Sequence, residues 1–201
     1  MQPFLHPRGD GSRIIGGKAA APHSWPFIAS IQMDGEHICG GFLVWPMWVM
    51  TAAHCLLNRS AALNEYVKLA HLPSPRVDLS PGTVCHVAGW GDISSSGDQP
   101  AELMETSTTI AKRSLCRTLW RGRVSTNIAL PAPCPPAIPL REGDSGGPLV
   151  FNKKVYGIVS FSGKRCGDRR YPDIYTKVSN YIDWAHRIVQ RQHHQKGQPK
   201  P

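Results

Sequence analysis

The chain has 201 residues, of which 41% are hydrophobic, and a formal net charge of +9 at pH 7. This length and composition allow one domain of ordinary size with its own core. No apolar run approaches the roughly 18 residues of a membrane span, and no cysteine–histidine cluster or nucleic-acid motif occurs. We therefore expect no metal, no cofactor and no nucleic acid as a partner. The 19 glycines and 18 prolines favour short strands and many turns over a helical bundle.

The positive charge has two readings that the sequence leaves open. It is either a well-solvated basic surface, or a site for acidic partners such as heparin-like glycans or anionic membranes. The basic residues are scattered, with modest clusters at 163–170 and 191–201. The second cluster is polar and contains proline, so residues 191–201 are predicted to be a basic disordered tail.

In chain order, residues 1–13 lack the apolar centre of a secretory signal. Residues 26–33 alternate between apolar and polar side chains, which predicts a strand. Two apolar segments follow at 37–45 and 48–55, separated by a turn that contains a proline. Residues 82–92 predict another strand, which ends in a glycine-rich turn.

The second half of the chain contains a loop, a hairpin and a helix. The proline-dense stretch 131–142 is predicted to be a loop, because proline is excluded from central strands. Residues 146–163 predict a hairpin that turns at Asn-Lys-Lys. A terminal helix is predicted from the apolar face made by Tyr181, Ile182, Ala185, Ile188 and Val189, with Ser179 or Asn180 as its cap. Many short strands with one terminal helix indicate an antiparallel barrel protein.

Six cysteines occur at positions 39, 55, 85, 116, 134 and 166, without the Cys-x-x-Cys spacing of a zinc site. Disulfides in an oxidising compartment are therefore expected. The triplet Asn-Arg-Ser places a glycosylation acceptor at Asn58, which is consistent with export.

Four short motifs occur in a specific order: Arg-Ile-Ile-Gly-Gly at 13–17, Thr-Ala-Ala-His-Cys at 51–55, Cys-His-Val-Ala-Gly-Trp-Gly at 85–91 and Gly-Asp-Ser-Gly-Gly-Pro-Leu-Val at 143–150. Together they closely resemble the trypsin/chymotrypsin family of serine endopeptidases, and most nearly its branch of granule and adipsin-like proteases. The resemblance covers roughly residues 13–190. It implies an all-β fold of two antiparallel six-stranded Greek-key barrels and a C-terminal helix. The domains expected are a propeptide-like leader (1–13), a peptidase domain (14–190) and the tail.

The resemblance implies a role for each motif. Ser145 would attack the peptide carbonyl, His54 would take its proton, and the N–H groups of Gly143 and Ser145 would form the oxyanion hole. Cleavage after Arg13 would free the amino group of Ile14 to pair with Asp144 and so shape the oxyanion loop. The eight other histidines carry no such context and are expected at the surface.

The acid of the catalytic triad is missing from this pattern. In the family it lies on a strand of the first barrel, after the histidine. Here His54 and Cys85 are 31 positions apart, against about 75 to 80 in an intact two-barrel domain. About 45 residues are therefore absent, the first barrel is expected to be truncated, and the acid is absent with them. The only carboxylates in the interval, Glu65 and Asp78, lack the apolar strand context of a triad acid.

The resemblance also suggests disulfides and a substrate pocket. Cys39 and Cys55 match the bridge next to the catalytic histidine, whereas Phe151 and Arg141 occupy the positions of the expected partners of Cys85 and Cys166. Cys134 is a displaced candidate partner for Cys116. The residues that match the substrate pocket are Pro139, Leu140, Ser160, Phe161, Ser162 and Asp173. An apolar pocket and a basic-selective pocket assisted by Asp173 both remain open.

Two functional hypotheses follow, besides a product of altered splicing. The first is a secreted or granule-stored serine endopeptidase, monomeric and made as a zymogen, with protein substrates, serpin-type inhibitors and heparin-like glycans as partners. The second is a catalytically inactive form or basic binding pseudoprotease, favoured by the missing acid and the net charge of +9.

Overall fold

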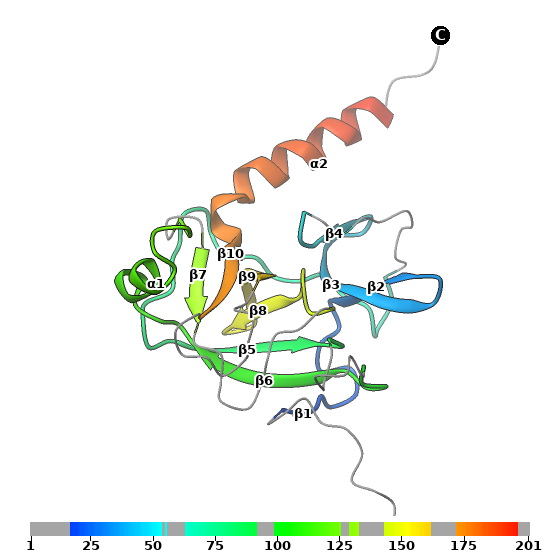
Figure 1. Cartoon of the computed structure of the whole chain (residues 1–201). Helices are drawn as coiled ribbons and strands as arrows, with labels where there is room; N and C mark the ends of the chain where they lie inside the picture. The colour runs from blue at the N-terminus through cyan, green and yellow to red at the C-terminus, as the bar shows by residue number, and fades with distance from the viewer. Residues whose placement is uncertain are drawn as a thin grey trace, which may run out of the picture.

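The protein is described by a computed structural model, which places residues 17–53, 55, 63–91, 99–125, 129–132, 143–161 and 172–196. Ten strands and three helical segments occur in these ranges (Figure 1). The strands are β1 (Lys18–Ala19), β2 (Ile28–Met33), β3 (Glu36–Trp45), β4 (Trp48–Met50), β5 (Val84–Gly89), β6 (Met104–Thr109), β7 (Ala129–Ala132), β8 (Pro148–Phe151), β9 (Lys154–Phe161) and β10 (Asp173–Lys177). The helices are α1 (Arg113–Leu119), the 3₁₀ turn η1 (Val178–Asn180) and α2 (Ile182–Lys196).

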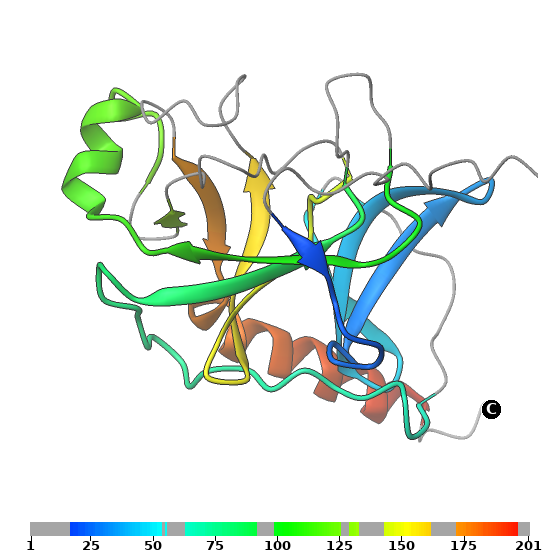
Figure 2. The same cartoon turned by 90° about the horizontal axis from the view of Figure 1, so that it is seen from below.

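All of the strand pairs are antiparallel and form two sheets. The larger sheet has the order β1-β6-β5-β8-β9-β10-β7, and the smaller has the order β2-β3-β4. Figure 2 shows the smaller sheet at one side of the larger one. The predicted all-β, chymotrypsin-like architecture with a C-terminal helix is confirmed. The larger sheet has seven strands rather than the six expected, because the two-residue β1 pairs with β6. The smaller sheet, which corresponds to the first barrel, has three strands in the described residues.

The hairpin predicted at 146–163 is formed by β8 and β9. Its turn residues Asn152 and Lys153 both have positive φ, at 46° and 61°. This left-handed turn matches the twist of the two flanking strands, and asparagine adopts it more readily than most residues. The polar Asn-Lys-Lys sequence therefore closes the hairpin, and two apolar arms enter the core.

The loop predicted at 131–142 is wrong at its first two residues. Pro131 and Ala132 belong to β7, which pairs with β10 through Pro131 and Ile174. Strand β7 lies at the end of the sheet order, and an edge strand tolerates a proline because one of its sides needs no partner. Residues 133–142 lie outside the described ranges.

The terminal helix α2 begins after η1 and packs through Ile182, Ala185 and Val189, which are buried. The predicted apolar face is therefore present, except that Tyr181 is exposed and precedes the helix. The helix continues to Lys196, so the boundary of a disordered tail at residue 191 is wrong. Residues 191–196 contain no glycine or proline, and the first helix-breaking residue is Gly197. None of the described helices is long and apolar enough to cross a membrane.

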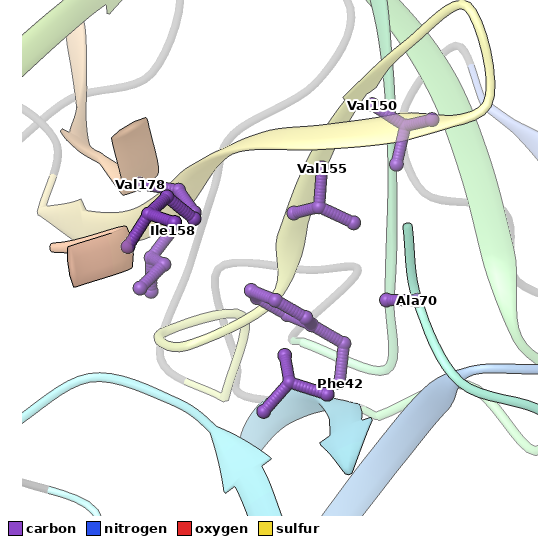
Figure 3. Close-up of a cluster of buried hydrophobic side chains, with 8 residues drawn as sticks. Phe42, Ala70, Val150, Val155, Ile158 and Val178 are labelled. Carbon is purple, nitrogen blue, oxygen red and sulfur yellow. The ribbon is translucent and has the colours of Figure 1, made fainter. Parts of the chain in front are cut away.

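One hydrophobic cluster joins the two sheets (Figure 3). Phe42 of β3 packs with Val150 of β8, with Val155 and Ile158 of β9, and with Val178 of η1. All five are buried. The cluster holds β3 against the larger sheet, and this contact fixes the position of the smaller sheet beside the turn that carries Ser145.

Asp78 joins the segment between the sheets to the larger sheet. Its carboxylate pairs with Arg113 of α1 and, at 3.0 Å, with Lys177 of β10. Burial alone would raise the pKa of Asp78, but the hydrogen bonds from Arg113 and Lys177 outweigh burial and hold it below its ordinary value. This carboxylate is therefore committed to a structural ion-pair network.

We expect Asp78→Asn to destabilise the fold at neutral pH by about 1 kcal/mol, a small value because the pairs are partly exposed. A carboxyl with a lowered pKa in the folded state stabilises above its ordinary pKa and loses this contribution as the pH falls through the lowered value. Urea unfolding of both proteins at about pH 7 and about pH 2 measures the effect. An unchanged difference at the two pH values would argue against the network.

Candidate active site

Ser145 lies in a tight turn between the two sheets. Its carbonyl accepts a hydrogen bond from the N–H of Gly40 in β3, at 2.8 Å. On the other side of the turn, the N–H of Gly146 donates to the carbonyl of Val159 in β9, also at 2.8 Å. One turn is thus anchored to both sheets, which is how a serine comes to lie at their junction.

The segment before His54 is anchored to the same point. The hydroxyl of Thr51 donates to the carbonyl of Gly40 at 2.7 Å, so Gly40 links this segment to the Ser145 turn. A disulfide joins Cys55 to Cys39 of β3, with Cα atoms 6.3 Å apart, and this is the pair that the resemblance implies. His54 itself lies outside the described residues, but Thr51 before it and Cys55 after it are linked to Gly40 and Cys39 of β3.

Two glycines of the turn are required by geometry. Gly143 and Gly146 have φ of 98° and 88°, a region that L side chains rarely adopt. A Cβ on Gly146 would lie 2.2 Å from the Gly40 carbonyl oxygen and 2.2 Å from the Thr51 hydroxyl oxygen. Only glycine therefore lets the serine turn approach β3 and the segment before His54 this closely.

His37 of β3 fixes the peptide group that follows Gly143. Its Nε2 lies 2.8 Å from the Gly143 carbonyl oxygen, and its Nδ1 lies 2.8 Å from the Ser30 hydroxyl. A carbonyl oxygen only accepts, so Nε2 carries the hydrogen and Nδ1 of the neutral ring accepts from Ser30. Burial lowers the pKa of His37, and the hydrogen bond to Gly143 only partly offsets this. His37 is thus a half-buried positioning residue, and the prediction that it lies at the surface is wrong.

The N–H groups of Gly143 and Ser145 flank the peptide group that His37 holds. Within the described part of the chain, the N–H groups of Gly143 and Ser145 donate to no backbone carbonyl. Amides that a fold holds in place without an internal partner can stabilise a developing negative charge.

Asp144 is buried, with 6% of its surface exposed. Its Oδ1 accepts a hydrogen bond from the N–H of Gly91 at 3.0 Å. A Cβ on Gly89 or Gly91 would lie 2.2 Å and 2.3 Å from the nearest carboxylate atom. Gly89 at the end of β5 and Gly91 two residues after it therefore make the space in which the Asp144 carboxylate lies.

Three of the six predicted pocket residues are described and lie on adjacent strands. Ser160 and Phe161 end β9, and Asp173 begins β10 with 1% of its surface exposed. The Ser160 hydroxyl lies 2.6 Å from that of Thr176 in β10. Val159, which bonds to the serine turn, directly precedes Ser160, so the structure brings this wall next to Ser145.

The other predicted site residues lie outside the described residues: Arg13, Ile14, His54, Asn58, Pro139, Leu140 and Ser162. Cys85 and Cys116 are buried free thiols, and burial raises the pKa of Cys85 to about 11. Cys134 and Cys166 are not described. Among the described residues, no cluster of histidine, cysteine, aspartate or glutamate could hold a metal ion.

Neither of the two carboxylates between His54 and Cys85 has the surroundings of a buried triad acid. Glu65 is exposed, and Asp78 is bound by Arg113 and Lys177. Sequence reasoning missed Ser30, His37 and Thr51, which position the turn. Thr51 lies in the histidine motif, so that motif could have pointed to it, whereas Ser30 and His37 carry no sequence signal of their own.

Comparison with known proteins identifies the class that this geometry defines. The profile of the Trypsin family matches residues 14–62 and 56–185. The chain therefore belongs to the trypsin family of serine proteases. It is 33% identical to serine protease 57 of Mus musculus over 238 residues, which include 89% of this chain and 82% of that protein. It is 32% identical to granzyme M of Homo sapiens, over 90% of this chain and 91% of that protein.

A solved structure supports the same fold. The structure of neuropsin, a serine protease expressed in the limbic system of mouse brain, matches with a TM-score of 0.78 and 25% sequence identity. The match covers 87% of this chain and 99% of neuropsin.

Proposed function

We propose that this chain carries the nucleophile, the base and the oxyanion hole of a serine endopeptidase but lacks the acid of the triad. Ser145 is the nucleophile, His54 is the general base, and the N–H groups of Gly143 and Ser145 bind the oxyanion. The observation that carries the proposal is the link through Gly40, which joins the Ser145 turn to Thr51, three residues before His54.

The alignment of the chain with its relatives supports the absence of the triad acid. The alignment with mouse serine protease 57 is 238 residues long, although it contains only 89% of a 201-residue chain. A large part of the relative thus has no counterpart here. The two parts of the family match meet at residues 56–62, directly after the histidine motif. The absent segment is the one that would bear the acid, and no cofactor is needed for this chemistry.

The test uses a restored chain, in which residues 56–62 are replaced by the longer corresponding segment of mouse serine protease 57. The restored chain should hydrolyse peptide substrates, and Ser145→Ala in the same chain should abolish turnover. Equal turnover in both proteins would remove Ser145 from the mechanism.

Activation follows from the position of Asp144. We infer that cleavage after Arg13 frees the Ile14 ammonium, which pairs with the Asp144 carboxylate and holds the oxyanion turn. The burial of that carboxylate beside Gly89 and Gly91 supports this, because a buried carboxylate attracts an ammonium group more strongly than an exposed one does. The substrate pocket is formed by the Ser160–Ser162 wall, Asp173, Pro139 and Leu140, and selects the residue before the cleaved bond.

A restored chain that begins at Ile14 should be at least about 100-fold more active than one that keeps residues 1–13, because only the freed Ile14 ammonium can form the buried ion pair with Asp144, and the loss of such a pair costs about 3–5 kcal/mol. Initial rates on one peptide substrate measure this ratio, and Asp144→Asn in the shorter chain should remove most of the gain. Equal rates with and without residues 1–13 would contradict zymogen activation.

We further propose a secreted or granule-stored monomer with protein substrates, serpin-type inhibitors and heparin-like glycans as partners. The Cys39–Cys55 disulfide, the Asn58 sequon and the charge of +9 support this setting. Without its acid, the chain itself would act as a basic binding protein rather than as an enzyme. That second function is favoured by the same net charge.

A further inference from the structure

An apolar trough lies between residues 48–53 and helix α2. It consists of two adjoining cavities of about 620 Å³ and about 290 Å³, which share the lining residues Met50, Thr51, Ala52, Ala53 and Trp184. The smaller cavity continues between Trp45 and Trp48 on one side and Ile188 of α2 on the other. None of the described lining residues of either cavity is charged.

Large apolar side chains are exposed at the rim of this trough and in the neighbouring β3–β4 turn. Trp184 of α2 is 54% exposed, and Met47, in the turn between β3 and β4, is 59% exposed. Trp45 and Trp48 flank that turn and are half-buried. The ring of Trp45 lies 5.4 Å from that of His186, so the β3–β4 turn and α2 meet at this rim. Three of the six tryptophans of the chain therefore surround one opening.

The outer face of α2 is basic beside this rim. Trp184, Arg187, Ile188 and Arg191 have the spacing of one helical face, opposite the buried Ile182 and Val189. Both arginines are exposed. An exposed tryptophan suits the boundary between lipid and water, because its ring is apolar and its N–H is polar, and neighbouring arginines are attracted to anionic headgroups.

We propose that the surface formed by α2 and the β3–β4 turn docks on an anionic lipid surface. The side chains of Trp184 and Met47 would enter the boundary between headgroups and acyl chains, while Arg187 and Arg191 contact the headgroups. The net charge of +9 adds long-range attraction to an anionic bilayer. A heparin-like glycan would use the arginines but has no apolar phase to receive the tryptophan, so the exposed aromatic rim favours lipid.

The larger cavity also contains Ser160 and Phe161 of the proposed pocket wall, but the side chains proposed to contact lipid, Trp184, Met47, Arg187 and Arg191, are not proposed catalytic or pocket residues. Lipid binding and peptide turnover can therefore fail separately, and the experiment reads binding alone.

The experiment is flotation of the full chain with vesicles of phosphatidylcholine and phosphatidylserine, with pure phosphatidylcholine vesicles for comparison. Flotation separates vesicle-bound chain from any aggregate, which sediments. The chain should float with the anionic vesicles only, and its tryptophan fluorescence should shift to shorter wavelength, by less in Trp184→Ser. Trp184→Ser should weaken binding about tenfold, and Arg187→Gln with Arg191→Gln should weaken it about fivefold for each arginine.

The controls are changes of the same kind at a distance from α2. Tyr66 is 52% exposed and lines a different cavity, with Ala19 and Pro22, so Tyr66→Ser removes a similar exposed ring. Lys112→Gln with Arg123→Gln removes the same two charges from the exposed surface around α1. Both controls should bind vesicles like the parent chain.

Three results would overturn the proposal. The first is no flotation with anionic vesicles. The second is vesicle binding that falls equally in the control and test variants, which would show that net charge alone is responsible. The third is binding to heparin, without vesicle binding, that Trp184→Ser leaves unchanged, which would assign the surface to a glycan.

Discussion

The chain without a restored segment, cleaved so that it begins at Ile14, is expected to hydrolyse peptides no faster than its own Ser145→Ala variant. Where serine, histidine and aspartate act together, neutralising the aspartate costs about 10⁴ in rate, because the histidine loses the partner that fixes its tautomer and stabilises its cation. We propose that the segment that bears the acid is absent as well, and on that proposal the loss should be greater. Glu65 is exposed and Asp78 is paired with Arg113 and Lys177, so neither replaces it.

The measurement is turnover of a peptide substrate by both proteins at equal concentration, with a cooperative unfolding transition as proof that each is folded. Turnover that disappears in Ser145→Ala would contradict the prediction. Variants Glu65→Gln and Asp78→Asn would then identify which carboxylate serves His54.

Gly146→Ala adds one methyl group and should reduce the stability of the fold more than the addition of a methyl group at any other glycine of the site. The new Cβ would lie 2.2 Å from the Gly40 carbonyl oxygen and from the Thr51 hydroxyl, at a φ of 88°. Left-handed strain and overpacking together should destabilise the fold by about 3 kcal/mol or more. The turn would also have to leave Gly40, which separates Ser145 from the segment before His54.

Gly82→Ala is the matched control, because Gly82 has nearly the same φ, 90°, with nothing within 4 Å of its Cβ position. It should cost only the backbone strain, about 1 kcal/mol. Urea unfolding of the two variants separates strain from contact. Equal losses of stability would mean that the close approach of the serine turn to β3 contributes nothing.

The fold was largely predictable because its signals are local. Alternating apolar and polar residues predict β2, the polar Asn-Lys-Lys turn predicts the β8–β9 hairpin, and the periodic apolar face predicts α2. The errors are also local. Pro131 enters an edge strand because tertiary position decides where proline is tolerated. Helix α2 extends to Lys196 because polar residues without a breaker continue a helix that is already started.

The site was less predictable where its parts come from different strands. Motifs identify Ser145 and Asp144, but the link from Ser30 through His37 to the Gly143 carbonyl spans 113 positions and depends on how the two sheets meet. Gly40 likewise appears only as a small residue in an apolar strand. Its N–H and carbonyl acquire their role once Ser145 and Thr51 lie on either side of it.

We propose that the active site is assembled apart from its acid and that the missing acid abolishes peptide hydrolysis. The most direct measurement is peptide turnover by two restored chains, one with the aspartate of the inserted segment and one with that aspartate changed to asparagine. The account predicts turnover with aspartate and a rate lower by about 10⁴ with asparagine. Equal turnover by the two folded chains would contradict it.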